Sequence, residues 1–318
     1  MNAKNIQANK NLYMFCSVLL IFFHFGFISF PNKADDLLKF HLSDRQTKTF
    51  NQSMNQKISM ENLFAWCIVP YDSKKRTPEE RIAMLKELGF KSYAYDWREE
   101  HLNSTVNELR IALENGIKIN AIWIWIDGQF DKPGQLSASN EKIFSALKET
   151  VISTQIWIGF NENYFSGLNH EKSLNKGIEM LRYLDGRAKE SGSKIALYNH
   201  GGWFGEPENQ VEMIERLPEC EIGMIYNFHH GHEQIEQFPQ LIKIMKPYLW
   251  AVNLNGMKKD GPKILTIGEG DKEAEMIKLL LNYDFNGPYG IIGHTEGEDV
   301  KKVLERNLNG LRSLGFVK

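Results

Sequence analysis

Eight short apolar runs alternate with helix-like stretches from residue 63 onward, and this alternation limits the possible folds more than any other feature. The runs are rich in β-branched and aromatic residues and are apolar nearly throughout. Such runs are typical of strands buried on both faces of a parallel sheet. In chain order they are "NLFAWCIVP", "KSYAYDW", "IKINAIWIWI", "TQIWIGF", "KIALYNHGG", "EIGMIYNF", "YLWAVNLNG" and "YGIIGHT".

The stretches between the runs carry helix signals. In "TPEERIAMLKELG", Thr77 is an expected N-cap, Pro78 occupies the first helical position, and Glu80 completes a capping box. A stripe typical of an amphipathic helix follows residue 298 and consists of Val300, Val303, Leu304, Leu308 and Leu311. Further helices are predicted at about 104–115, 140–152, 173–191, 207–217, 233–246 and 271–283.

Eight strand–helix units in about 250 residues match the size of a TIM barrel. We therefore predict an α/β fold, a single-domain (β/α)8 barrel over residues 61–318. The rival is a doubly wound open sheet. That fold usually has a glycine-rich turn after its first strand, whereas this chain has "VPYDSKK" there. In a TIM barrel the active site lies at the C-terminal ends of the strands, so the polar residues that end each strand are the candidates.

Histidines gather at three of these strand ends. His200 follows the fifth strand, His294 follows the eighth, and "IYNFHHGHEQ" places His229, His230 and His232 directly after the sixth. These are five of the nine histidines in the chain. Random placement rarely produces such a concentration, so we predict a functional cluster. The alternative is that exposed strand ends merely tolerate histidine.

Several motifs resemble those of the xylose isomerase-like TIM barrels, a group of sugar isomerases and epimerases that also includes the endonuclease-four type of nuclease. They are "YNHGG", "YNFHHGH", "IGEGD" and "GPYGIIGH", and the resemblance covers nearly all of residues 63–315. It implies a barrel that moves a proton next to a sugar carbonyl, which requires a base and a donor for the developing enolate.

The chain departs from the family pattern where a divalent metal is usually held. The usual Glu-Asn-His of strand five is here Tyr198-Asn199-His200, and the Asp of an Asp-x-x-His pattern is Asn227, before His230. Strand seven has Asn253 in place of the family's His. The resemblance still implies one possible divalent ion, zinc, manganese or similar, held by His200, His230 and His294. A site without metal remains the alternative.

Roles for these residues follow from the resemblance and from their chemistry. Neutral histidine is a base near pH 7, and protonated histidine can donate to an enolate oxygen. The predicted catalytic residues are His200, His230, His294 and Glu162. The predicted substrate-binding residues are Asp96, Tyr198, Trp203, Asn227, His229, His232, Asn255 and Glu296. Asp96 could instead cap the chain or pair with Arg98, and Trp203 could be a packing residue.

Two functional alternatives stay open besides a sugar isomerase or epimerase. A 3-keto-glycoside lyase or hydrolase would use the same proton abstraction, and a carbohydrate-binding barrel would have lost catalysis. Hydrolysis by paired carboxylates fits less well, because no Asp/Glu pair ends opposite strands. The net charge of −2 and the lack of an Arg/Lys stripe disfavour a nucleic-acid partner.

The N-terminus differs from the rest of the chain. Lys4 and Lys10 precede the apolar "LYMFCSVLLIFFHFGFISF", so residues 1–30 are predicted to be a signal peptide or an uncleaved membrane anchor. Residues 31–60 are predicted to be a polar, disordered linker. Membrane contact is expected only through the first segment. Export favours a small, non-phosphorylated carbohydrate as substrate, since sugar phosphates are chiefly cytoplasmic.

Overall fold

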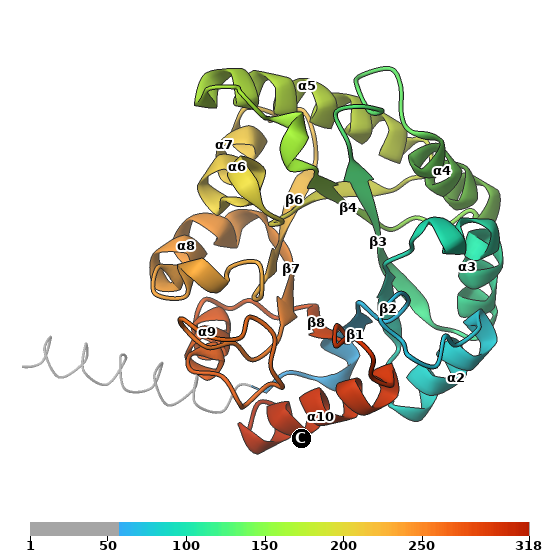
Figure 1. The fold of residues 1–318 in the computed structure, drawn as a ribbon, viewed down its shortest axis with the longest axis vertical. Helices are drawn as coiled ribbons and strands as arrows, with labels where there is room; N and C mark the ends of the chain where they lie inside the picture. Colours follow the sequence, from blue (N-terminus) through green and yellow to red (C-terminus); the bar gives the residue numbers. More distant parts are fainter. Residues whose placement is uncertain (1–56, 318) are drawn as a thin grey trace, which may run out of the picture. The chain divides into compact units, whose positions relative to one another are not determined.

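The computed structural model describes residues 57–317, which form one closed barrel of eight parallel strands in chain order. The helices surround the strands, and the last helix completes their ring by lying between the first helix and the last but one (Figure 1). The predicted (β/α)8 fold is therefore confirmed for this part of the chain. The strands are β1 (Leu63–Trp66), β2 (Ser92–Tyr95), β3 (Lys118–Ile126), β4 (Gln155–Phe160), β5 (Lys194–Tyr198), β6 (Ile222–Asn227), β7 (Leu249–Leu254) and β8 (Tyr289–Ile292).

The helices lie close to their predicted positions. They are α2 (Pro78–Glu87), α3 (Thr105–Glu114), α4 (Ala138–Thr150), α5 (His170–Lys189), α6 (Gly202–Gly205), α7 (Pro207–Glu215), α8 (Phe238–Met245), α9 (Glu273–Asn282) and α10 (Val300–Ser313). Helix α8 begins later than the predicted residue 233. Pro239 lacks an N–H and its ring would clash with a preceding helical turn, so it is tolerated only in the first turn.

Large rings facing small residues fill the interior of the barrel. Phe64, Trp66 and Trp157 pack there against alanines from other strands. A Cβ atom on Gly223 would come 2.0 Å from the Trp250 ring, and one on Gly290 would come 2.8 Å from Phe64. Side chains at these two glycines would collide with the rings, so the interior accepts its aromatic residues only because glycine stands opposite them.

The first strand ends earlier than the apolar run predicts. Cys67 has a φ of 56°, in the left-handed region, which breaks the extended backbone after Trp66. The next two N–H groups, of Ile68 and Val69, donate to Asp96 Oδ1 at 3.3 and 3.2 Å. The chain thus turns from β1 into the mouth of the barrel instead of continuing as a strand.

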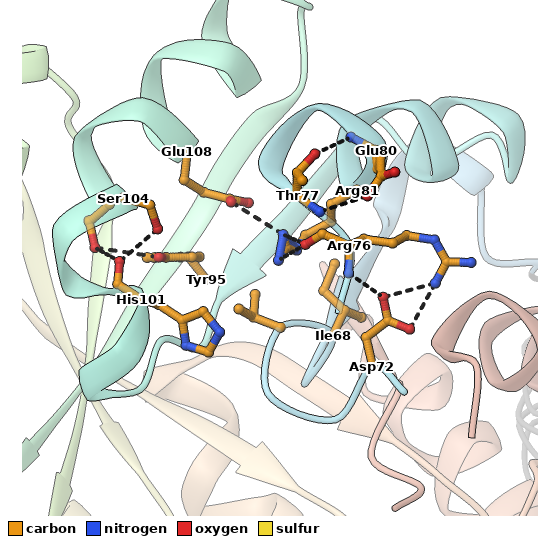
Figure 2. A network of polar contacts seen from close by, with 12 residues as sticks. Ile68, Asp72, Arg76, Thr77, Glu80, Arg81, Tyr95, His101, Ser104 and Glu108 are labelled. Carbon is orange, nitrogen blue, oxygen red and sulfur yellow. Dashed lines mark hydrogen bonds and ion pairs between the residues drawn. The ribbon is translucent and has the colours of Figure 1, made fainter. Parts of the chain in front are cut away.

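A polar network joins α2, α3 and β2 beside this turn (Figure 2). Thr77 and Glu80 form the predicted capping box, with the Glu80 carboxylate accepting from the Thr77 N–H at 2.9 Å. The buried Arg81 guanidinium lies 3.3 Å from Glu108, whose other oxygen accepts from the Tyr93 hydroxyl at 2.7 Å. These contacts fix α2 against α3 and so hold the β1–α2 loop.

The predicted export segment, residues 1–30, lies outside the described residues, as do residues 31–56 of the predicted linker. No helix within residues 57–317 is long and apolar enough to cross a membrane. Cys67 and Cys220 are both free thiols.

Candidate active site

A cavity of about 100 Å³ opens at the C-terminal ends of the strands. Its walls come from the ends of β1, β2, β3, β5, β6 and β8 and the loops after them. The lining residues are Trp66, Cys67, Tyr71, Asp96, Arg98, Trp123, Tyr198, His200, His229, His230 and His294.

Four imidazole rings form an arc across this cavity. The centroid of the His200 ring, after β5, lies 4.3 Å from that of His230, after β6. The His230 ring lies 3.8 Å from His229, and the His229 ring lies 5.9 Å from His294, after β8. Segments almost a hundred residues apart therefore bring their histidines to one mouth, because each follows the same end of a parallel strand.

The two middle rings of the arc are held neutral. Burial, with smaller contributions from the neighbouring His294, His200 and Lys263, lowers the pKa of His229 to about 3. Burial likewise lowers the pKa of His230 strongly, with His229 as the next cause. A charged imidazolium in either place would lose its hydration and be repelled by its neighbours.

The two end rings are also neutral at pH 7, but each has a carboxylate nearby. Burial lowers the pKa of His200, while the charge of Glu162 opposes that shift. Burial lowers the pKa of His294, while Glu296 opposes the shift and Arg98 adds to it. The end rings can therefore accept a proton more easily than the middle ones.

Asp96 and Arg98 bring polar groups from the end of β2 into the cavity. Burial raises the pKa of Asp96 to about 7, although the nearby Arg98 charge opposes that shift. Asp96 Oδ1 accepts the two backbone N–H groups described above, and its Oδ2 has no hydrogen-bond partner among residues 57–317. Arg98 donates to the carbonyls of Asp96 and Trp97 at 3.1 and 2.8 Å, so it does not form the suggested ion pair with the Asp96 carboxylate.

Tyr198 occupies the floor of the cavity and is fixed by two donors. The Trp66 Nε1–H donates to its hydroxyl at 3.2 Å, and the Asn227 amide donates to the same oxygen. Burial raises the pKa of Tyr198 well above its usual value, so the group stays a neutral phenol. The resemblance placed Tyr198 and Asn227 where relatives hold a metal, and here the two side chains bond to each other.

Six of the twelve predicted site residues line this cavity, and Asn227 lies directly behind Tyr198. The six predicted residues that line the cavity are Asp96, Tyr198, His200, His229, His230 and His294. His232 lies elsewhere, since its Nε2 is 2.6 Å from the Lys258 carbonyl oxygen. Asn255 is buried and donates to the carbonyls of Gly256 and Lys263, and Glu296 is exposed beyond His294.

The other two predicted residues, Glu162 and Trp203, line a second cavity of about 250 Å³ between the loops after β4 and β5. The sequence did not single out Trp66, Tyr71 or Trp123 for the main cavity. Trp66 was not predicted to line the cavity, because the first strand was expected to run to residue 70 and so not to end at Trp66. Tyr71 lies 3.6 Å, ring to ring, from His294, and only the bend at Cys67 brings it there.

The donors at the mouth do not fit a divalent metal ion. Among residues 57–317, no group of three or more His, Cys, Asp or Glu side chains is placed to hold one. Two imidazoles that bind one zinc at 2.0–2.1 Å have ring centroids about 5 Å apart, whereas the rings of His200 and His230, two of the three predicted ligands, lie 4.3 Å apart. Magnesium and manganese prefer carboxylate oxygens. The predicted ion at His200, His230 and His294 stays a prediction that this packing does not support.

Comparison with known proteins defines the fold. No family model and no curated protein matches the sequence. Among solved structures, 3-keto-D-glucoside 4-epimerase from E. coli has a TM-score of 0.61 at 14% identity, over 79% of this chain and 99% of its own. D-psicose 3-epimerase, solved in the presence of D-fructose, has a TM-score of 0.59 at 15% identity, over 80% and 98%.

A xylose isomerase-like TIM barrel protein from Mycobacterium smegmatis, in complex with magnesium, is a further match. Its TM-score is 0.52 at 14% identity, over 79% of this chain and 96% of its own. At such identities the likeness concerns the fold and leaves the chemistry to the residues of this chain. The chain thus has the fold of the xylose isomerase-like TIM barrels, the architecture shared by these sugar epimerases.

Proposed function

We propose that this protein is a sugar isomerase or epimerase that moves a proton on the carbon next to a carbonyl group. The observation that carries the proposal is the arc of four neutral imidazoles across the mouth of the barrel. Neutral imidazole is a competent proton acceptor near pH 7, and general acid–base catalysis of this kind contributes about 10²–10⁴-fold to a rate. The fold and its similarity to sugar epimerases support a carbohydrate as the substrate.

In this proposal the two ends of the arc exchange protons with the substrate. His200 and His294 follow β5 and β8, which lie on different sides of the closed barrel. A sugar bound between them would present one face to each ring. One imidazole, neutral when the sugar binds, removes the proton and becomes imidazolium. The other first takes up a proton from solvent and then returns it to the opposite face or to the neighbouring carbon. Glu162 and Glu296 favour the protonated state of these two rings.

The remaining lining residues would bind the sugar and stabilise the enolate. Arg98 is the cation among the lining residues, and a fixed positive charge stabilises the developing oxyanion in a site that excludes water. Asp96 and the Tyr198 hydroxyl are further polar groups for the sugar hydroxyls. His229 and His230 stay neutral and offer ring nitrogens as hydrogen-bond partners.

Solvent exchange tests this function directly. Ketoses, aldoses and 3-keto-glucosides are incubated with the enzyme in D2O, and deuterium entry at the carbon beside the carbonyl is followed by NMR. We expect exchange with at least one sugar, and its loss in His200→Gln and in His294→Gln with the circular dichroism spectrum unchanged. Binding without exchange for every sugar would instead indicate the carbohydrate-binding barrel.

The 3-keto-glycoside lyase remains the second candidate, since it starts from the same proton abstraction. The second cavity favours it, because its lining begins at Gly201, the residue after His200, and it would hold a second group. The two functions differ in their products. An epimerase keeps the glycosidic bond and changes one stereocentre, whereas a lyase releases the aglycone, which the same NMR experiment detects.

We also propose that the substrate is a non-phosphorylated sugar met outside the cytoplasm. This rests on the basic and apolar residues 1–30 of the sequence. Cell fractionation of the full chain, compared with a chain that begins at residue 57, tests it. Recovery of both chains in the cytoplasmic fraction would contradict export.

A further inference from the structure

We propose that the second cavity, between the loops after β4 and β5, is a subsite for a second sugar ring, so that the substrate is a disaccharide or a glycoside. This inference rests on the proposed function, because it extends the same active site. The cavity has a volume of about 250 Å³, and its walls include Glu162, Phe165, Ser166 and Trp203.

Trp203 supplies an aromatic wall whose orientation is fixed. Its ring centroid lies 5.0 Å from that of Phe165, and its Nε1–H donates to His170 Nδ1 at 3.2 Å. The side chain is only partly buried, so one part of the indole remains open to the cavity. The C–H groups on one face of a pyranose ring pack well against such a surface, because both are apolar, flat and rigid.

Glu162 supplies the polar counterpart. Its side chain is exposed, and no ion pair or side-chain hydrogen bond within residues 57–317 occupies its carboxylate. A free carboxylate accepts two hydrogen bonds from neighbouring hydroxyl groups on a sugar. An aromatic wall beside an unpaired acceptor is an arrangement suited to a ring that has one apolar face and a hydroxylated edge.

Two consecutive glycines keep this cavity open. Gly201 and Gly202 have φ values of 53° and 58°, a region in which glycine is the favoured residue. A Cβ atom on Gly202 would lie 3.3 Å from Glu162 Cγ, and one on Gly201 would lie 3.4 Å from Glu162 Oε1. Side chains at these positions would therefore crowd the carboxylate and fill the space beside it.

The loop after β5 contributes to both cavities. His200 lines the main cavity, and the next three residues in the chain line the second. Strands β4 and β5 are paired neighbours, so the loops that follow them lie side by side. A glycoside whose first ring lies between the imidazoles would reach past His200 and place its second ring between Trp203 and Glu162.

Calorimetric titration with neutral sugars tests the subsite. D-glucose and D-fructose represent one ring, and cellobiose, maltose and sucrose represent two. We expect at least one disaccharide to bind about tenfold or more tightly than its component monosaccharides, which corresponds to about 1.4 kcal/mol. Trp203→Ala should reduce this preference to near unity. Ser166→Phe, at an exposed position in the cavity wall, should also reduce the preference to near unity, because its ring fills the cavity. This second variant keeps the test valid if Trp203→Ala does not fold.

Phe130→Ala is the matched control, because Phe130 is an exposed aromatic residue that lines neither cavity. It should leave both affinities unchanged. If monosaccharides bind and exchange deuterium but disaccharides bind no more tightly, the subsite is wrong and the proposed function stands. The subsite is also wrong if the preference survives in both Trp203→Ala and Ser166→Phe. If none of the sugars binds, the subsite and the proposed function fail together.

Discussion

Strand β2 contributes to two buried polar clusters that differ in how completely their atoms are bonded. Toward α2 and α3, Tyr93 donates to Glu108. Glu108 pairs with Arg81, which also donates twice to the Arg76 carbonyl (Figure 2). This is the flank network. Within it, Arg81 Nε is the one side-chain atom left without a partner among the described residues.

The mouth cluster, formed by Asp96, Trp123, Asn227 and the four histidines of the arc, is bonded much less completely. Asp96 Oδ2, Trp123 Nε1, Asn227 Oδ1 and His229 Nδ1 are all buried and lack a hydrogen-bond partner within residues 57–317. Unsatisfied buried groups cost stability, and a protein retains them where a ligand or a reaction uses them. The difference teaches that the flank network uses its polar atoms to hold the barrel together, whereas the mouth cluster, in the proposed function, keeps polar atoms free for a substrate.

The largest expected effect separates activity from stability at the mouth. His200→Ala should lower kcat by about 10²–10⁴-fold, because it removes a proton-transferring imidazole at one end of the arc. His230→Ala should lower kcat less, because it removes a hydrogen-bond partner of the substrate. Neither residue bonds the flank network, so thermal unfolding should shift little. The measurements are deuterium exchange for activity and calorimetry for Tm. Normal turnover in both variants would show that the arc is not the site.

The opposite result is expected from the flank network. Arg81→Met leaves the Glu108 carboxylate buried without its cation, and breaking a buried pair in this way costs about 3–5 kcal/mol. Deuterium exchange per folded molecule should remain, because Arg81 does not line the cavity.

Arg110→Met is the matched control for the flank network. It breaks the exposed ion pair in which Arg110 Nη2 lies 2.7 Å from Glu149 Oε1. The loss of unfolding free energy should be less than about 1 kcal/mol. Equal losses of unfolding free energy in the Arg81 and Arg110 variants would remove the distinction between the two regions.

A smaller effect concerns the pH dependence of stability. The folded-state pKa of His229 is about 3, below its usual value near 6.5, so the unfolded chain binds the extra proton between these two values. This contribution is complete above about pH 6.5 and is lost as the pH falls toward 3. From pH 7 to pH 4, the unfolding free energy of the wild type should fall by up to about 1.4 kcal/mol per pH unit more than that of His229→Gln. Denaturation at several pH values measures both. Parallel slopes would mean that His229 is not buried as a neutral ring.

The sequence predicted the strands and the mouth better than the flank. Eight apolar runs define the barrel, and the rule that strand ends share one mouth is enough to bring His200, His229, His230 and His294 together. Each of these residues follows its strand within about three positions, so the geometry of the strand alone determines where it lies.

The predicted residues that lie away from the main cavity, and the lining residues that were not predicted, depend on loops and on the reach of side chains. His232 lies only two residues after His230, yet its ring contacts the Lys258 carbonyl because the loop after β7 covers it. Tyr71 reaches the cavity only through the left-handed backbone at Cys67. The Arg81–Glu108 pair joins two helices through long side chains, and no spacing along the chain indicates it.

The capping box of α2 gives the smallest expected effect and belongs to the part of the flank that could be predicted from the sequence. The Thr77 hydroxyl accepts from the Glu80 N–H at 3.3 Å, and this contact is exposed to solvent. Thr77→Ala should therefore cost only about 1 kcal/mol, measured by urea denaturation. Thr77→Ser retains the hydroxyl and should behave as the wild type. If Thr77→Ala destabilises the protein as much as Arg81→Met, then the start of α2 and the buried pair unfold as one unit. In that case the anchoring of α2 contributes more to the stability of the flank network than the Arg81–Glu108 ion pair does.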